Sequence, residues 1–323
     1  MDTLLGISSK KEFEQLALTI FNVQVRENSV YRDFVRSLKV DPSNVTSLET
    51  IPFLPIEFFK THKLISGSWN AEESEQVFTS SGAVQSRHYV KDAAVYEKSY
   101  RKGFTHFYGP IENYCVLALL PSYLEREGSS LIYMADDLIK RSGHRHSGFY
   151  LHNYEDLIKK LGMLDSQGQK VLLLGVTYAL LDLAERHQFS LNHTIIMETG
   201  GMKGRRTEMV REELHAVLYG RFGVDAIHSE YGMTELLSQA YSNGKGVFYC
   251  PPWMTVMIRD TNDPFSYLAY NRTGGINVID LANVHSCSFI ATQDLGRNHA
   301  DGSFEVLGRF DNSDLRGCNL LVG

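Results

Sequence analysis

Apolar residues in the first forty positions recur with the period of a helix. Ser8 and Ser9 precede a run whose apolar side chains fall on one helical face, so we expect a helix to begin at these serines. The apolar residues of this run are Phe13, Leu16, Ala17, Ile20 and Phe21. The spacing of Val30, Phe34 and Leu38 predicts a second, shorter helix.

The next apolar stretch, IPFLPIEFFK at residues 51–60, has a different pattern. It places two prolines among large apolar side chains. Proline fixes its own backbone angle and restricts the residue before it. The sequence therefore predicts an extended and packed segment here rather than the interior of a helix.

From Gln76 to about Ala240, short apolar runs alternate with helical stretches. The predicted strands are QVFTS, YCVLALL, SGFYL, KVLLLGV, TIIMET and AIHSEY. The predicted helices include residues 92–107 and 207–222, and Gly223 stands in the C-cap position of the second. Such alternation predicts parallel strands covered by helices on both faces.

After Tyr241 the helical signal fades and short strands predominate. They are WMTVMIRD, GINVIDL, SFIATQD and SFEVLGR, with Gly, Asn and Asp turns between them. This pattern predicts an antiparallel sheet or small barrel. The predicted fold class is α/β, and we expect four parts: helices and the proline-containing segment (1–74), an α/β core (75–241), a β-rich subdomain (242–309) and a tail (310–323).

Composition narrows the classes of partner. The chain has 323 residues and a net charge of −6, which argues against nucleic acid as a partner. The N-terminus lacks a secretory signal and no apolar run reaches membrane-spanning length, so we expect a cytoplasmic protein without membrane insertion. Its four cysteines are widely spaced and suggest no disulfide framework. Zinc ligation by Cys250, His285 and Cys287 is an alternative, although the chain has no C-x-x-C pair there.

Three polar, glycine-bearing stretches follow predicted strands: TSSG, ETGGMKGR and SEYGMTE. In open α/β sheets, ligands bind beyond the carboxyl ends of the strands. We therefore expect these three loops to converge on one edge and form a site. The SGHRHSG stretch at residues 142–148 is a further candidate for acyl or phosphate contact, with a solvated loop as the alternative.

Each candidate loop has an ordinary explanation beside the functional one. TSSG offers backbone N–H and hydroxyl donors to an anion, but it also suits a serine-rich β-turn. In SEYGMTE, a hydroxyl and a carboxylate suit a phosphate and its magnesium, but Thr234 and Glu235 also suit the first turn of a helix. Asp294, at a strand end, offers two acceptor oxygens to a ribose, while the nearby Asp301-Gly302 pair is a hairpin signal.

Together these motifs resemble those of a known superfamily. Thr-Ser-Ser-Gly, Tyr-Gly-Met-Thr-Glu, Thr-Gln-Asp-Leu-Gly and Gly-Arg-Phe-Asp occur in the order found in adenylate-forming enzymes, which include acyl-CoA synthetases, adenylation domains and luciferases. Within that superfamily, IPFLPIEFFK, TSSG, LLPSYLEREGSSLIYM, LLLGVTYAL and the terminal RGC resemble the long-chain acyl-protein synthetases of bacterial luminescence systems. The phenylacetate-CoA ligase-like branch shares several of these features.

The resemblance implies an ATP site and Mg²⁺. The residues that would surround the β- and γ-phosphates are Thr79, Ser80, Ser81 and Gly82. Tyr231 and Gly232 would contact adenine, while Thr234 would reach the α-phosphate. Glu235 would hold the metal. Asp294 and Arg309 would fix the ribose, and Gly200 and Gly201 would separate adenine from the acyl group.

Two departures from the family pattern bear on turnover. The phosphate loop of relatives continues with Thr-Thr-Gly and a lysine, whereas this chain has Ala-Val-Gln-Ser at 83–86, and Arg87 is the candidate replacement cation. Relatives also continue past the Gly-Arg-x-Asp hinge into a mobile domain that carries a lysine. We expect this chain, with only a short tail, to lack that domain.

The resemblance further implies a thioester on Cys318, which Arg316 would favour as a thiolate; packing of a small side chain is the alternative. The expected function is ATP-dependent activation of a carboxylic acid, in particular a fatty acid, with transfer to a thiol and then to a reductase or carrier protein. The alternatives are a ligase or acyltransferase completed by a partner domain, and a nucleotide- or acyl-binding protein without turnover.

Overall fold

The computed structural model describes residues 2–81, 84–121, 127–200 and 209–310. Its first part is helical, as expected, because Ser9 caps the first long helix by accepting a hydrogen bond from the Glu12 N–H at 3.2 Å. The elements are α1 (Asp2–Leu5), α2 (Lys10–Glu27), α3 (Ser29–Ser37), η1 (Pro42–Asn44), η2 (Leu48–Thr50), β1 (Leu54–Pro55), α4 (Phe58–Thr61) and η3 (Ala71–Glu73).

The proline-containing segment is only partly extended. Leu54 pairs with Ile290 of a later strand in parallel register, which confirms the extended part. Residues Phe58–Thr61 instead form the short helix α4, so the expectation of a wholly extended segment is wrong. Both prolines precede α4, and therefore neither removes one of its backbone hydrogen bonds.

The core is a six-stranded sheet in the order β5-β4-β6-β7-β8-β9 within the described residues. Its strands are β4 (Cys115–Leu119), β5 (Gly148–Phe149), β6 (Val171–Val176), β7 (Thr194–Thr199), β8 (Ile227–Tyr231) and β9 (Ala240–Ser242). All neighbouring pairs are parallel except β8 with β9. The predicted parallel sheet is confirmed for the strands from residue 115 to residue 231.

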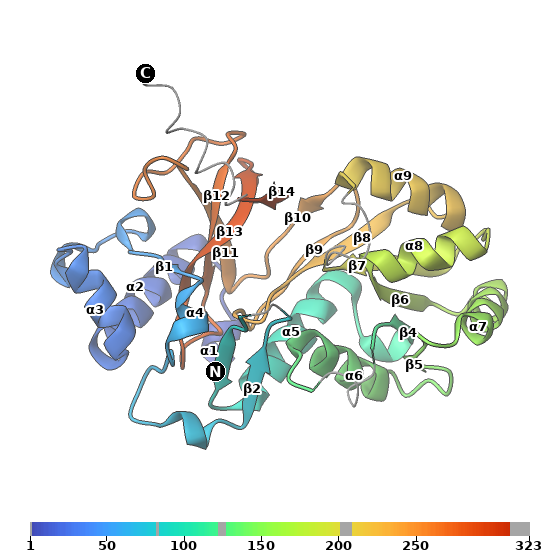
Figure 1. Cartoon of the computed structure of the whole chain (residues 1–323), viewed down its shortest axis with the longest axis horizontal. Coiled ribbons are helices and arrows are strands. Elements are labelled where there is room, and N and C mark those ends of the chain that lie inside the picture. Colours follow the sequence, from blue (N-terminus) through green and yellow to red (C-terminus); the bar gives the residue numbers. More distant parts are fainter. Residues whose placement is uncertain (1, 82–83, 122–126, 201–208, 311–323) are drawn as a thin grey trace.

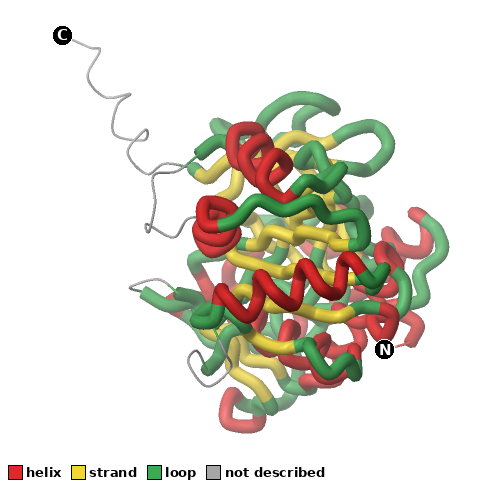
Figure 2. Tube along the Cα trace, turned by 90° about the vertical axis from the view of Figure 1, so that its right-hand side faces the viewer, coloured by secondary structure: helices red, strands yellow, loops and turns green. Residues whose placement is uncertain are grey.

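Helices cover both faces of this sheet. They are α5 (Ala93–Tyr108), η4 (Ile111–Asn113), α6 (Ser130–Ser142), α7 (Tyr154–Ser166), α8 (Thr177–Arg186) and α9 (Arg211–Phe222). Helices α8 and α9 lie on one side, with α5 and α6 on the other (Figure 1), and Figure 2 shows helices lying over the strands. Helix α9 begins later than expected, at Arg211, and ends at Gly223, whose φ of +63° provides the predicted left-handed cap.

One predicted strand does not join the core sheet. Residues Gln76–Thr79 (β2) pair with Arg87–Val90 (β3) in a separate antiparallel sheet. The connection between them is too short for the crossover that a parallel pair needs. The expectation that the TSSG loop follows a strand of the parallel sheet is therefore wrong.

The C-terminal part is the predicted antiparallel sheet. Its strands are β10 (Val247–Phe248), β11 (Met254–Arg259), β12 (Gly274–Asp280), β13 (Phe289–Asn298) and β14 (Phe304–Arg309), in the order β10-β14-β13-β12-β11 with β1 beside β13. The turn between β13 and β14 contains Gly302 at a φ of +87°, as the Asp-Gly hairpin signal predicts.

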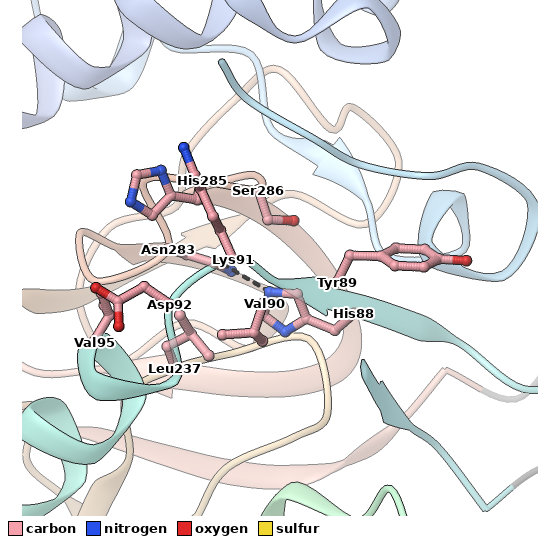
Figure 3. A pocket seen from close by; sticks show the side chains of 10 residues that line it. All are labelled: His88, Tyr89, Val90, Lys91, Asp92, Val95, Leu237, Asn283, His285 and Ser286. Atoms are coloured by element: carbon pink, nitrogen blue, oxygen red, sulfur yellow. Dashed lines mark hydrogen bonds between the residues drawn. The ribbon is translucent and has the colours of Figure 1, made fainter. Parts of the chain in front are cut away.

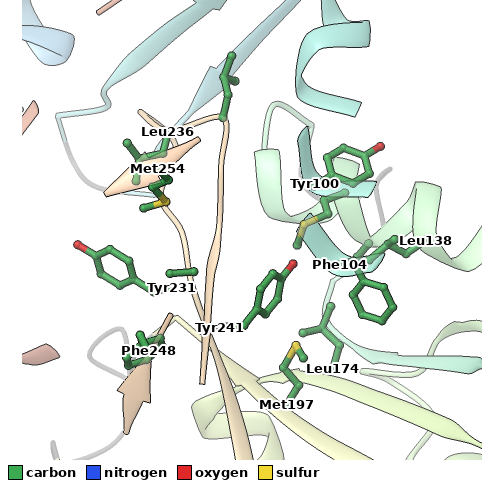
Figure 4. Packing of buried hydrophobic residues seen from close by; sticks show 14 of the residues in the cluster. Tyr100, Phe104, Leu138, Leu174, Met197, Tyr231, Leu236, Tyr241, Phe248 and Met254 are labelled. Atoms are coloured by element: carbon green, nitrogen blue, oxygen red, sulfur yellow. The ribbon is translucent and has the colours of Figure 1, made fainter. Parts of the chain in front are cut away.

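Buried aromatic rings join the parts. The ring of Phe21 in α2 packs edge-on against Phe289 in β13, with centroids 6.2 Å apart. The ring of Tyr31 in α3 stacks on the same residue, with centroids 6.1 Å apart. Figure 4 shows Tyr231 and Tyr241 between the β-rich part and the helices of the core. Among the described residues, no helix combines the length and apolarity needed to cross a bilayer.

Candidate functional site

The site centres on three residues that the sequence analysis singled out, from two sheets. The Tyr231 hydroxyl, at the end of β8, donates a 2.8 Å hydrogen bond to Oδ2 of Asp294 in β13. Nε of Arg309 lies 3.3 Å from Oδ1 of Asp294. Residues 294 and 309 are direct cross-strand partners in the β13–β14 ladder. The structure therefore brings Tyr231, Asp294 and Arg309 together.

The Asp294 carboxylate is mostly buried but keeps some access to solvent. Its side chain is 14% exposed, whereas that of Arg309 is 71% exposed. Burial raises the pKa of Asp294, and the Tyr231 hydrogen bond and the Arg309 charge oppose this rise. A register shift immediately after this position, between Leu295 and Gly296, bends β13 where the carboxylate projects. The carboxylate is thus oriented by protein donors and remains reachable by a ligand.

The Thr234–Glu235 pair lies in a turn, not at the start of a helix. The helix-cap alternative is therefore wrong. Two residues that sequence reasoning missed hold this turn by its backbone. Nδ1 of His88 lies 2.8 Å from the carbonyl oxygen of Thr234, and the Asn283 side-chain amide donates to the carbonyl oxygen of Glu235 at 2.8 Å.

His88 and Asn283 also contact each other. Nε2 of His88 lies 2.9 Å from Oδ1 of Asn283. Figure 3 shows the two side chains beside a small pocket. Burial lowers the pKa of His88 to about 4, and the contacts with Thr234 and Asn283 oppose this fall. Because Asn283 precedes the C-terminal strand β13 and His88 lies in β3, this pair connects the β2–β3 hairpin, the turn and the C-terminal part.

The Glu235 side chain faces the base of the TSSG loop. Burial raises the pKa of Glu235, while a hydrogen bond from Ser86 and the charges of Lys60 and Arg309 oppose the rise. Lys60, on α4, was not among the residues expected at the site. The structure therefore places Glu235 among a hydroxyl donor and two cations, next to the hairpin loop.

The TSSG stretch forms the start of the β2–β3 hairpin loop. The Ser86 N–H donates to Oγ of Ser80 at 2.9 Å, and the Ser80 N–H donates to the Ser86 carbonyl oxygen at 3.2 Å. Thr79 ends β2, Ser81 is exposed in the loop, and Gly82 lies outside the described residues. Contacts between Ser80 and Ser86 thus close the base of the loop, and Ser86 also lies next to Glu235.

Arg87 is less well placed than expected. It pairs with Thr79 across the hairpin, while His88 pairs with Phe78. Because neighbouring side chains in a strand point to opposite faces, Arg87 lies on the face opposite His88. His88 faces the Thr234–Glu235 turn, so the Arg87 side chain leaves its strand on the side away from that turn.

A second buried carboxylate lies at the adjoining strand ends. Glu230 accepts a hydrogen bond from the Thr199 hydroxyl, its register partner on β7. Burial raises the pKa of Glu230 to about 7, and the neighbouring charge of Glu198 adds to this rise. A Cβ on Gly232 would lie 2.3 Å from Oε1 of Glu230, so this position accepts only glycine without rearrangement. Glu230 lies within the SEYGMTE stretch, but the sequence analysis gave it no role.

Gly200 follows β7 with a φ of +68°, and its carbonyl oxygen accepts a 2.9 Å hydrogen bond from the Thr177 hydroxyl. Gly201 and Cys318 lie outside the described residues. Within the described ranges no three His, Cys, Asp or Glu side chains gather as a metal-binding group, so the zinc alternative finds no support there.

The SGHRHSG stretch lies away from the site. It precedes β5, which runs parallel to β4, and so it lies at the amino ends of the strands. The Ser147 hydroxyl accepts a 2.9 Å hydrogen bond from the Val116 N–H, which is a structural role. The structure supports the solvated-loop alternative for this stretch.

No family model matches the sequence, and a sequence search of curated proteins found no match. Solved structures do match. ATP-bound MatB from Rhodopseudomonas palustris has a TM-score of 0.55 and 17% identity, over 76% of this chain and 50% of that one. A 2-hydroxyisobutyryl-CoA ligase in the postadenylation state, in complex with 2-HIB-AMP, has a TM-score of 0.64 and 13% identity, over 94% and 68%.

An open conformation of the same ligase, bound to 2-HIB-AMP and CoA, has a TM-score of 0.62 and 12% identity, over 94% of this chain and 70% of that one. The chain spans about half the length of MatB. At these identities the likeness concerns the fold, and the expected α/β architecture is confirmed. This chain has the fold of adenylate-forming ligases.

Proposed function

We propose that the protein uses ATP to activate a carboxylic acid as an acyl adenylate and then transfers the acyl group to a thiol. The observation that carries this proposal is the Tyr231–Asp294–Arg309 cluster, which joins the end of β8 to β13. The fold, shared with ligases solved with ATP or an acyl-AMP, supports it. A carboxylate held by protein donors yet reachable from solvent suits the two hydroxyls of a ribose.

In the first step, a carboxylate oxygen of the substrate attacks the α-phosphorus of ATP. The new bond is an acyl–phosphate bond, and the bond to pyrophosphate breaks, so pyrophosphate leaves with the electron pair. This reaction needs positioning and charge neutralisation more than it needs a strong base. In this proposal Tyr231 and Gly232 contact adenine and Thr234 contacts the α-phosphate. Asp294 and Arg309 bind the ribose.

The β- and γ-phosphates are assigned to the hairpin loop, through Thr79, Ser80, Ser81 and Gly82. Arg87, at the base of the same loop, faces away from the Thr234–Glu235 turn and is therefore left out of this assignment. Gly200 with Gly201 forms the wall between adenine and the acyl group. The contact between Ser80 and Ser86 holds the two ends of this loop together.

Mg²⁺ fits the carboxylate of Glu235. Magnesium in nucleotide sites is usually held by one or two carboxylates together with substrate phosphates, so a larger cluster of acidic residues is not required. The carboxyl lies beside the hydroxyl of Ser86 and close to two cations, which favour its charged form. Mg²⁺ bound there would neutralise charge on the phosphates.

In the second step, a thiolate attacks the acyl carbon, a thioester forms and AMP leaves. The proposed nucleophile is Cys318, by likeness to acyl-protein synthetases, with a fatty acid as substrate and a reductase or carrier protein as the final acceptor. The cysteines within the described residues are less suited as nucleophiles, because burial raises the pKa of the Cys115, Cys250 and Cys287 thiols and so disfavours the thiolate.

Mass spectrometry of the intact protein, after incubation with ATP, Mg²⁺ and a panel of fatty and aryl acids, tests both steps. We expect an acid-dependent mass increase that hydroxylamine removes and that Cys318→Ala abolishes. Labelling that persists in Cys318→Ala contradicts the assigned nucleophile. Product only after adding CoA or a carrier protein favours the ligase completed by a partner. ATP binding without pyrophosphate release favours the binding protein, which the altered residues 83–86 also motivate.

A further inference from the structure

Helix α4 is seated between the two halves of the candidate nucleotide site. Phe59 packs edge-on against the His88 ring, with centroids 5.5 Å apart, and His88 in turn contacts the carbonyl oxygen of Thr234. Immediately before α4, Glu57 accepts a hydrogen bond from Gln293, the neighbour of Asp294. Two independent contacts therefore fix this short helix beside both Thr234 and Asp294.

Lys60 follows Phe59 directly and projects from this helix into solvent. Phe59 is buried, with 1% exposure, whereas Lys60 is exposed. Lys60 lies close enough to the Glu235 carboxyl for its positive charge to act on that group. Within the described ranges, the Lys60 ammonium makes no hydrogen bond or ion pair, so its charge is available to a ligand.

The other cationic side chains around the site are already hydrogen-bonded or ion-paired, or they point away from the Thr234–Glu235 turn. The Arg259 guanidinium donates to the carbonyl oxygens of Ile276 and Thr292, at 2.7 and 2.6 Å. Arg309 pairs with Asp294, and Arg87 lies on the face of its strand opposite His88. Lys60 is therefore the described cation that combines proximity to Glu235 with a free ammonium group.

We propose that Lys60 binds the phosphates of ATP and supplies the positive charge that the hairpin loop does not direct toward Glu235. The inference rests on the proposed function, since it assumes that ATP occupies this site. The ammonium forms no covalent bond. It offsets negative charge on the bound triphosphate and on the departing pyrophosphate, and a charge of this kind acts most strongly at short range.

Lys63 is the matched control. It lies three positions along the chain, but its ammonium is 3.3 Å from Glu72, outside the site. The experiment compares Lys60→Ala, Lys60→Arg and Lys63→Ala by acid-dependent ATP–pyrophosphate exchange over a range of ATP concentrations. Calorimetric titration with ATP and Mg²⁺ gives the affinity independently of turnover, and thermal unfolding confirms that each variant is folded.

For Lys60→Ala we expect ATP affinity and kcat/KM for ATP to fall by about tenfold to a hundredfold, with partial recovery in Lys60→Arg. Lys63→Ala is expected to stay within about twofold of the wild type, as an exposed ion pair contributes little. If wild-type protein binds ATP and Lys60→Ala matches Lys63→Ala, the inference about Lys60 fails alone. If wild-type protein binds no ATP, the proposed function and this inference fail together.

Discussion

The hydroxyl of Tyr231 donates a 2.8 Å hydrogen bond to Asp294, and this contact spans from the core sheet to the C-terminal sheet. It links the residue assigned to adenine with the residue assigned to ribose. Because Asp294 is largely buried, its charged form depends on the donors that surround it.

Replacing Tyr231 with Phe removes this donor while keeping the ring. We expect a loss of about 1–3 kcal/mol in the free energy of unfolding, since a buried carboxylate loses a partner, and a rise of about tenfold in KM for ATP. Chemical denaturation and pyrophosphate-release kinetics measure the two effects. Tyr270→Phe, at a ring that is 56% exposed, is the control. Equal behaviour of the two variants would show that the contact has no role.

The Gly232→Ala variant tests how closely Glu230 packs beneath the Tyr-Gly pair. A Cβ there would lie 2.3 Å from Oε1 of Glu230 and 3.3 Å from Cγ of Gln239. We expect destabilisation by about 1–3 kcal/mol, measured by urea unfolding. Gly220→Ala on α9 is the control, because a Cβ at that position meets no atom within 4 Å. It is expected to be neutral or to stabilise the helix by up to about 1 kcal/mol.

His88 and Asn283 are expected to act as one unit that positions the Thr234–Glu235 turn. Removing either side chain releases a backbone carbonyl of the turn, and removing the second then costs little more. We predict that His88→Ala and Asn283→Ala each lower kcat/KM for ATP by about tenfold and that the double variant resembles the single ones. Fully additive losses, measured in the same exchange assay, would mean that the two residues act independently.

From the raised pKa of Glu230 we predict that the free energy of unfolding depends on pH. Its pKa in the fold is raised from 4.5 to about 7, so it stabilises the fold while protonated, and this contribution is lost as pH rises between those values. Glu230→Gln lacks this loss. Relative to wild type, the variant should therefore gain about 3 kcal/mol in unfolding free energy between pH 4.5 and pH 8.

His88 has the opposite effect in the same range. Its pKa is lowered from 6.5 to about 4, so its contribution is present above pH 6.5 and is lost as pH falls toward 4. The two groups partly cancel in the wild type, and Glu230→Gln is expected to unmask the acid-side loss. Denaturation curves at several pH values test this. A pH-independent difference between Glu230→Gln and wild type would contradict the pKa of Glu230.

Local sequence pattern was sufficient for most of the fold and for part of the site. Alternating apolar and helical stretches predicted the parallel strands, and Asp294 and Arg309 were identified from motifs that the structure brings together. The pairing of β2 was missed, because apolar strand residues look alike in parallel and antiparallel sheets.

The residues that support the site carry no local signal. His88 and Asn283 act through backbone carbonyls, which every residue has, and the partners are far apart in sequence. Lys60 is the last residue of the proline-containing segment, and the apolar pattern of that segment gives no sign that its ammonium lies at a site. Only the folded chain places these three residues beside Glu235.

Acid-dependent ATP–pyrophosphate exchange, measured with labelled pyrophosphate, tests acyl adenylate formation most directly. We predict that wild-type protein exchanges label only when a carboxylic acid and Mg²⁺ are present. Asp294→Ala is expected to lower the exchange rate by about a hundredfold or more. Exchange that needs no acid, exchange unchanged in Asp294→Ala, or no exchange with any acid of the panel would contradict it.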